Sequence, residues 1–148
     1  MPSGAHDHAR DPRNDEILIW VNGELKPRAE ATVSVFDSGF VLGDGIWEGL
    51  RIHGGHPAFL EQHLDRLWEG AAALMIDIGL SREELTRAVY DTLAANEMTD
   101  GVHVRLMVTR GVKSTPYQDP RVTVGPATIV IIAEHKDCLL YTSDAADE

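Results

Sequence analysis

The chain has the sequence DSGFVLGDGIWEGLR from residue 37 to residue 51, and HLDRL follows at residues 63–67. Three glycines interrupt the first half of the longer stretch, which predicts a loop, because glycine relieves the steric limits on a turning backbone. From Ile46 to His53 the sequence favours a strand that turns at Gly54-Gly55. The two stretches therefore predict a loop, a strand and a helix in that order.

Side chains alternate between the two faces of a strand, so residues 46–53 divide into two sets. One face is mainly apolar and suits a core: Ile46, Glu48, Leu50 and Ile52. The other face combines an aromatic ring, a glycine and charge: Trp47, Gly49, Arg51 and His53. Because the second set is poor core material, we expect it to line a pocket.

The surrounding sequence predicts an α+β domain. Apolar residues recur at helical spacing from Glu61 to Met75, and Ser81 with Glu84 forms a capping box that begins a second helix towards Asn96. Strand-forming residues occupy further segments: 17–21, 24–27, 31–36, 56–60, 102–110 and 128–133. We predict a mostly antiparallel sheet of about six strands with two helices packed on it.

Composition limits the function classes. The chain has 148 residues, the size of one domain, and its formal net charge of -11 argues against a nucleic-acid surface, which needs a basic face. No apolar run approaches the roughly 20 residues of a membrane helix. We therefore expect a soluble, cytoplasmic protein with neither nucleic acid nor membrane as a partner. His6 and His8 are too few ligands for a metal site, and no metal is assigned.

Three segments are expected along the chain. Residues 1–16 are charged and show no helical or strand periodicity of apolar residues, which predicts a mobile N-terminal arm. Residues 17–136 are expected to form the domain. Residues 137–148 resemble the out-of-frame translation of a transposase mosaic-end sequencing adapter, so they are excluded from the fold prediction. The alternative for this last segment is a natural, disordered acidic terminus.

Arg66 is a candidate anion ligand on the first helix. It follows His63 by three residues, so both side chains lie on one helix face. A guanidinium there presents a fork that suits a phosphate, and His63 is close enough to assist. The alternative is a plain ion pair of Arg66 with Asp65 or Glu69.

Arg105 is a second candidate, because it lies within an otherwise apolar strand. A cation in that position must face a counter-ion or a cavity, since burying it unpaired is costly. Either a substrate carboxylate or Glu48 is expected to be the counter-ion.

Several motifs, in order, resemble the class IV aminotransferases, the fold type IV pyridoxal-phosphate enzymes. These motifs are Val21-Asn22-Gly23-Glu24, Phe40 to Arg51, His63 to Leu67 and Val108-Thr109-Arg110-Gly111. The resemblance extends from Ile17 to Glu134 and covers the small N-terminal domain of that family. It implies pyridoxal 5'-phosphate as the cofactor, an amino acid and a 2-oxo acid as substrates, and a homodimer at full length.

The resemblance also implies roles for single residues. One position matches the ligand of the cofactor phosphate and four match the substrate pocket: Arg66 for the phosphate, and Trp47, Gly49, Arg51 and Arg105 for the substrate. Residues 47–51 look more like the branched-chain enzymes, although Leu106 replaces the proline that commonly follows the pocket arginine. Gly43-Asp44-Gly45 is instead the form found in D-amino-acid enzymes.

By the same resemblance, the lysine that binds the cofactor covalently belongs to a second domain that this chain lacks. Lys26, Lys113 and Lys136 do not match its position, so no catalytic residue is assigned and the chain alone is expected to be inactive. Alternatives within the family are an aminodeoxychorismate lyase and a D-amino-acid aminotransferase. A non-catalytic α+β binding or dimerisation module is the alternative of another class.

Overall fold

The structure, a computed structural model, describes residues 10–137 and has the predicted α+β architecture. Its sheet has six strands in the order β2-β1-β6-β5-β3-β4, and every neighbouring pair is antiparallel. The strands are β1 (Leu18–Val21), β2 (Glu24–Pro27), β3 (Gly45–His53), β4 (His56–Pro57), β5 (Val102–Thr109) and β6 (Thr128–His135). The helices are α1 (Ser38–Leu42), α2 (Leu60–Leu74) and α3 (Arg82–Ala95).

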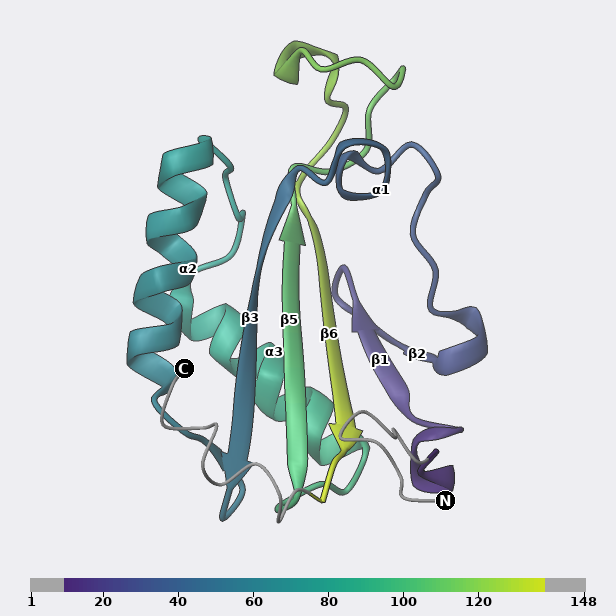
Figure 1. The fold of residues 1–148 in the computed structure, drawn as a ribbon, viewed down its shortest axis with the longest axis vertical. Coiled ribbons are helices and arrows are strands. Elements are labelled where there is room, and N and C mark those ends of the chain that lie inside the picture. The colour runs from purple at the N-terminus through teal and green to yellow at the C-terminus, as the bar shows by residue number, and fades with distance from the viewer. Residues whose placement is uncertain (1–9, 138–148) are drawn as a thin grey trace, which may run out of the picture.

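The two long helices lie on one face of the sheet and leave the other face open. α2 packs along β3, whereas α3 crosses behind β5 and β6 in the view of Figure 1 and contacts β6 and β1. Alternate residues of the central strands face these helices and form the core, among them Leu50, Val104 and Ile131, each at 0% exposure. The sequence alternation of apolar and polar residues thus separates a core face from an open face.

Two local sequence signals are confirmed. Asn22 and Gly23 both have positive φ, 50° and 95°, as the two-residue turn between β1 and β2 requires. Ser81 caps α3, where its side chain accepts from the Glu84 N–H while the Glu84 side chain accepts from the Ser81 N–H.

The prediction of a strand at residues 31–36 is wrong. This segment, which lies wholly within the described part of the chain, forms no strand and leads directly into α1. Val35 and Phe36 are 66% and 44% exposed, so their β-forming side chains lie outside the buried core. The backbone contacts another segment only at the end of this stretch, where the Phe36 carbonyl accepts from the Lys113 N–H over 2.9 Å and Asp37 forms an isolated bridge with Val112. Strand propensity without a buried face does not form a strand here.

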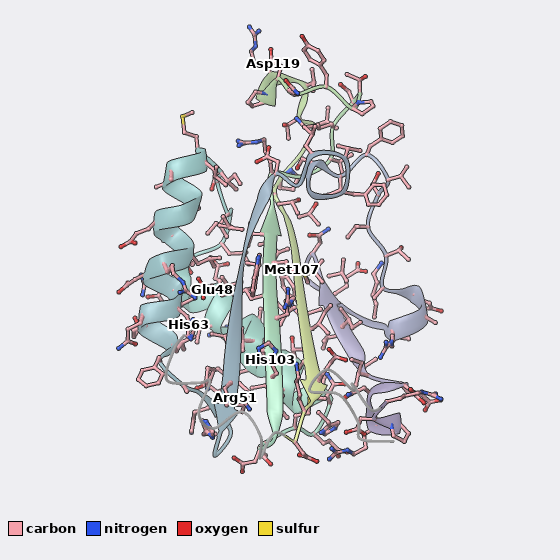
Figure 2. All side chains as sticks on the ribbon, viewed as in Figure 1. Glu48, Arg51, His63, His103, Met107 and Asp119 are labelled. Atoms are coloured by element: carbon pink, nitrogen blue, oxygen red, sulfur yellow. The ribbon has the colours of Figure 1, made fainter. Side chains whose placement is uncertain are left out.

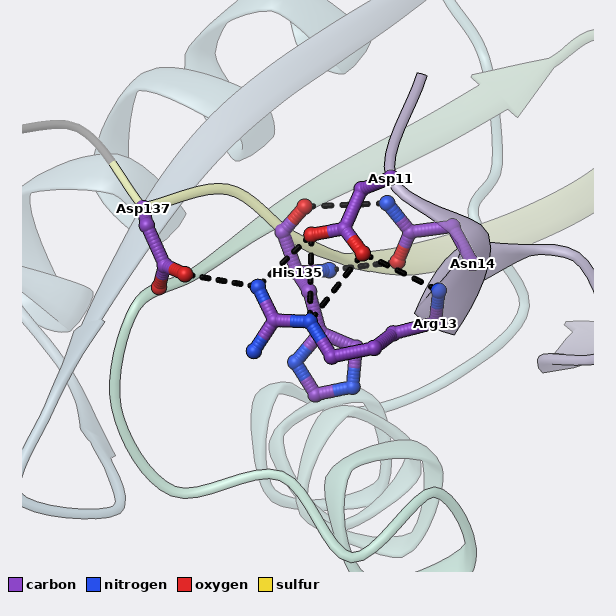
Figure 3. Close-up of polar contacts among 5 residues, drawn as sticks. All are labelled: Asp11, Arg13, Asn14, His135 and Asp137. Atoms are coloured by element: carbon purple, nitrogen blue, oxygen red, sulfur yellow. Dashed lines mark hydrogen bonds and ion pairs between the residues drawn. The ribbon is translucent and has the colours of Figure 1, made fainter. Parts of the chain in front are cut away.

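The described part of the expected N-terminal arm contacts the end of β6 (Figure 3). The Asn14 amide donates to the His135 carbonyl over 2.9 Å and accepts from the His135 N–H over 2.7 Å. Arg13 pairs with Asp137 and with Asp11, each at 2.6 Å. Side-chain and backbone hydrogen bonds from Arg13 lower the pKa of Asp11 to about 2. Residues 1–9 and 138–148, the rest of the arm and most of the expected adapter segment, lie outside the described residues.

Within residues 10–137, no helix is both long enough and apolar enough to cross a lipid bilayer.

Candidate functional site

β3 has the two faces that its sequence predicts. Glu48, Leu50 and Ile52 are at most 3% exposed and point to the helix side, whereas Trp47 is 57% exposed on the open face. β5 pairs with β3 along its whole length, with Gly49 opposite Arg105 and Arg51 opposite His103. The candidate residues of the two strands therefore share the open face.

On the helix side, Glu48 is the centre of a charged cluster at the junction of β3 and α2 (Figure 2). Arg66 donates from Nε to Glu48 Oε1 over 2.6 Å and from Nη2 to Oε2 over 2.7 Å. His63 Nδ1 lies 2.7 Å from the same Oε2. The Glu48 side chain is 3% exposed while the Arg66 side chain is 62% exposed, so a buried carboxylate pairs with an exposed guanidinium.

The electrostatics of this cluster favour an ionised Glu48. Burial by itself raises the pKa of Glu48, but hydrogen bonds from Arg66 and His63, together with the Arg66 charge, outweigh burial and lower that pKa below its usual value. A buried carboxylate needs such partners, because an unpaired one is costly. Glu48 is therefore a fixed negative charge behind an exposed guanidinium.

The role of Glu48 was not predicted from the sequence. The strong ion pair of Arg66 is with Glu48, and Asp65, one of the two acids considered as its partner, accepts from Arg82 over 2.7 Å. One signal was available, since Glu48 is the one charged residue on the apolar face of its predicted strand. The contact itself depends on how α2 packs against β3.

On the open face, the guanidinium carbon of Arg105 lies 4.2 Å from the centroid of the Trp47 ring, a cation–π contact. The expected alternative partner of Arg105, Glu48, lies on the opposite face of the sheet, so that alternative is wrong. A Cβ atom at Gly49 would come within 3.0 Å of His103 Nε2. Glycine at this position therefore lets the His103 ring lie over β3.

β3 separates the candidate phosphate ligand from the candidate substrate residues. Trp47, Gly49, Arg51 and Arg105 lie together on the open face, whereas Arg66 comes from the helix side. β4 pairs only with Ile52 and His53, and the Ala58 N–H donates to the Arg51 carbonyl, so β3 forms the border of the sheet from Gly45 to Leu50. A ligand at this border could contact both groups.

The loop before β3 is fixed by Arg110, which follows the last residue of β5. Its Nε donates to Asp44 Oδ2 over 2.6 Å, and its Nη atoms donate to the carbonyls of Leu74 and Met75 over 2.7 and 3.1 Å. The Gly43-Asp44-Gly45 segment is thus a turn tied to the C-terminus of α2. Gly43 has a φ of 65° and caps α1, a conformation that favours glycine.

The lysines lie away from this site. Lys113 is 1% exposed, and its Nζ donates to the Asp119 carbonyl over 3.4 Å. Lys26 pairs with Glu24 on β2, at the opposite edge of the sheet, and Lys136 follows β6. Two hollows of the described surface also lie elsewhere, between α2 and α3 and beside the C-terminus of α2. The candidate site is consequently an open surface with no adjacent amine among the described residues.

Comparison with known proteins shows what the chain is similar to. The family model described as "Amino-transferase class IV" matches residues 45–144, a range that continues past the described residues. "Branched-chain-amino-acid aminotransferase-like protein 1" of Arabidopsis thaliana is 46% identical over 125 residues, which are 84% of this chain and 22% of that protein. A D-alanine aminotransferase of Listeria monocytogenes is 39% identical over 110 residues, 74% of this chain and 36% of that protein.

Solved structures of aminotransferases and of a lyase have a fold similar to that of this chain. The branched-chain aminotransferase of the archaeon Thermoproteus uzoniensis, solved with norvaline, superposes with a TM-score of 0.68 at 27% identity, covering 80% of this chain and 40% of that one. A branched-chain amino acid aminotransferase complexed with N-(5'-phosphopyridoxyl)-L-glutamate gives a TM-score of 0.73 at 25% identity, covering 84% and 42%. The 4-amino-4-deoxychorismate lyase of Pseudomonas aeruginosa gives a TM-score of 0.63 at 30% identity, covering 79% and 39%.

This chain spans less than half the length of each of these proteins. The family model nevertheless covers most of the chain, and the motifs it matches include β3, α2 and their Glu48–Arg66 pair. The chain belongs to the class IV aminotransferases, a pyridoxal-phosphate-dependent family.

Proposed function

We propose that this chain supplies the phosphate-binding and substrate-facing part of the active site of an enzyme that transfers the amino group of a branched-chain amino acid to a 2-oxo acid. The observation that supports this most directly is the Arg66 guanidinium, held in place by a buried carboxylate at the border of the sheet. Family membership supplies the reaction class.

The residues at this border fit the phosphate of pyridoxal 5'-phosphate. Arg66 engages Glu48 through Nε and Nη2, and its side chain is 62% exposed at the border of the sheet. A planar guanidinium presents pairs of parallel donors, and such a pair matches two phosphate oxygens. The described residues offer no amine beside this position, so the covalent attachment of the cofactor is assigned to another part of the enzyme.

The open face would bind the amino acid. Arg105 and Arg51 are cations on neighbouring strands that suit a carboxylate, and the Trp47 ring offers an apolar surface to a hydrocarbon side chain. Pyridoxal phosphate, when bound, supplies a reactive aldehyde and an electron-accepting ring. The contribution of this chain is then to orient the substrate and to hold the phosphate.

The branched-chain assignment rests on relatives. The relative named as branched-chain-like has 46% identity, against 39% for the D-alanine aminotransferase. Assaying the full-length protein with leucine, D-alanine and aminodeoxychorismate tests it. We expect leucine with 2-oxoglutarate to be the best pair, and a higher kcat/KM for either rival substrate would reject the assignment.

We further propose that the enzyme acts in the cytoplasm as a homodimer. Apolar side chains are exposed along the segment before β3, and a partner would bury them: Val33, Val35, Phe36, Phe40 and Leu42. Exposed apolar surface of this kind marks an interface. Sedimentation of the full-length protein tests the dimer, which a single monomeric species at micromolar concentration would contradict.

We propose that residues 17–136 are native domain sequence and that residues 137–148 come from a sequencing adapter. Sequencing the source gene beyond codon 136 tests this, and recovery of codons for Cys138 to Glu148 in the genome would reject it.

A further inference from the structure

We infer that Glu48 positions Arg66 for the cofactor phosphate and that His63 in turn supports Glu48. The inference rests on the function proposed above. It assigns a role to a buried acid that touches neither the phosphate nor the substrate.

Arg66 and Glu48 differ strongly in exposure. Arg66 is 62% exposed on a long side chain, and an arginine of that kind normally samples many rotamers, which costs entropy when a ligand orders it. Glu48 is 3% exposed on β3 and fixes the guanidinium through two hydrogen bonds of 2.6 and 2.7 Å. The guanidinium is therefore held by Glu48 before a ligand arrives, which lowers the entropy cost of binding.

His63 contacts Glu48 from the same helix as Arg66. Its Nδ1 lies 2.7 Å from Glu48 Oε2, the oxygen that also accepts from Arg66 Nη2. The acid thus contacts two residues on one face of α2, three positions apart, and cannot turn about its carboxylate axis without breaking one of the contacts. This bracing fixes the plane of the carboxylate and hence the plane of the bidentate guanidinium.

Two accounts of the pair predict opposite effects on phosphate affinity. If Glu48 only neutralised Arg66, removing its charge would leave a more cationic surface and strengthen phosphate binding. If Glu48 positions Arg66, its removal frees the guanidinium and weakens binding. Glu48→Asp shortens the acid by one methylene and keeps its charge. This variant should weaken phosphate binding only if Glu48 positions Arg66, because the charge that neutralises Arg66 is still present.

The test measures the affinity of the full-length protein for pyridoxal 5'-phosphate and for pyridoxal, which lacks the phosphate, by fluorescence titration. We expect Glu48→Gln and Glu48→Asp each to weaken pyridoxal 5'-phosphate by about 10-fold, the lower end of the effect that supporting residues have on a bound metal. Pyridoxal affinity should stay unchanged. His63→Gln should act in the same direction with a smaller loss.

Asp65→Asn is the matched control. Asp65 is the residue before Arg66 on α2, but its carboxylate accepts from Arg82, so the variant makes the same charge change without touching the cluster. It should leave both affinities at the wild-type value. Thermal midpoints of all variants, measured alongside, identify any loss that comes from unfolding.

The outcomes separate this inference from the proposed function. Unchanged or tighter pyridoxal 5'-phosphate binding by both Glu48 variants would overturn the positioning role, as would an equal loss of pyridoxal. The double variant Glu48→Gln/Arg66→Met leaves no buried acid unpaired and tests the phosphate site itself. If the double variant still preferred pyridoxal 5'-phosphate over pyridoxal as strongly as the wild type, the proposed phosphate site would be wrong.

Discussion

Glu48 is an acid in a strand position whose neighbours on the same face are core residues. Burying it costs desolvation energy, and the contacts with Arg66 and His63 offset that cost. A position of this kind has a stability effect that depends on pH. Above the pKa of Glu48, its ionised carboxylate accepts hydrogen bonds from Arg66 and His63. Below that pKa the carboxyl group is neutral, and the charge contribution to these contacts is lost.

Glu48→Gln should therefore lower stability at neutral pH by about 1–2 kcal/mol, a modest value because Arg66 is largely exposed. The folded-state pKa of Glu48 lies below the ordinary value of 4.5. Its contribution is consequently full above about that pH and is lost as the pH falls through the folded pKa. Urea denaturation of both proteins at pH 7 and pH 3 checks the sign: the difference should shrink in acid, and a constant or growing difference would contradict it.

At the scale of elements, Arg110 joins three parts that are distant in sequence: the end of β5, the turn before β3 and the C-terminus of α2. The side chain is 14% exposed and donates both to Asp44 and to two helix carbonyls. Cations stabilise a helix C-terminus, where carbonyl groups lack intrahelical donors. The arrangement holds the loop next to the edge strand.

Arg110→Met should destabilise the domain by about 2 kcal/mol, since it leaves Asp44 and the carbonyls without their donor. Amide exchange should also quicken in the last turn of α2. Arg87→Met, at an exposed arginine of α3, is the control and should change little. Equal denaturation midpoints for the two variants would show that Arg110 does not fix the loop.

Asn14 pairs with the backbone of His135, the last residue of β6. Its amide mimics a strand partner for the His135 peptide, and the residue is only 8% exposed. Asn14→Ala should cost about 1–3 kcal/mol, because it leaves both backbone groups of His135 unsatisfied. Arg13→Ala, which removes only solvent-exposed pairs, should leave the urea midpoint unchanged. If the two variants behave alike, the amide pairing is not what fixes residues 10–16.

These elements show how far sequence could predict the molecule. The alternation of side chains along a strand predicted that Trp47 and Gly49 lie on the face of β3 opposite to that of Glu48. The capping box at Ser81 predicted the start of α3. The Glu48–Arg66 contact joins residues 18 apart and depends on how α2 packs on β3, which no local pattern encodes. The Trp47–Arg105 contact likewise depends on the register of β3 with β5.

At the scale of the whole molecule, the sheet has one face covered by helices and one face open. The open face bears Trp47, and the segment before β3 adds Phe40 at 73% exposure. Exposed apolar surface of this kind is typical of a site that contacts another molecule. The candidate site lies at the border between the covered face and the open one.

The chain by itself should consequently fail to catalyse transamination even where it binds the cofactor. Its lysines are Lys26, Lys113 and Lys136, and none lies beside Arg66 or on the open face near Trp47. Glutamate formation from leucine and 2-oxoglutarate, with pyridoxal 5'-phosphate present, is the measurement. The rate with the 148-residue chain should equal the rate with free cofactor.

The full-length protein, assayed at the same concentration, should form glutamate at least about 10³-fold faster, well within the range of enzymatic acceleration. Adding Lys113→Met to the full-length protein should leave that rate intact, provided that the thermal midpoint shows it folded. Turnover by the short chain that disappears with Lys113→Met would instead make this buried lysine the catalytic amine. That result would require the site to lie in the loop after β5, away from Glu48 and Arg66.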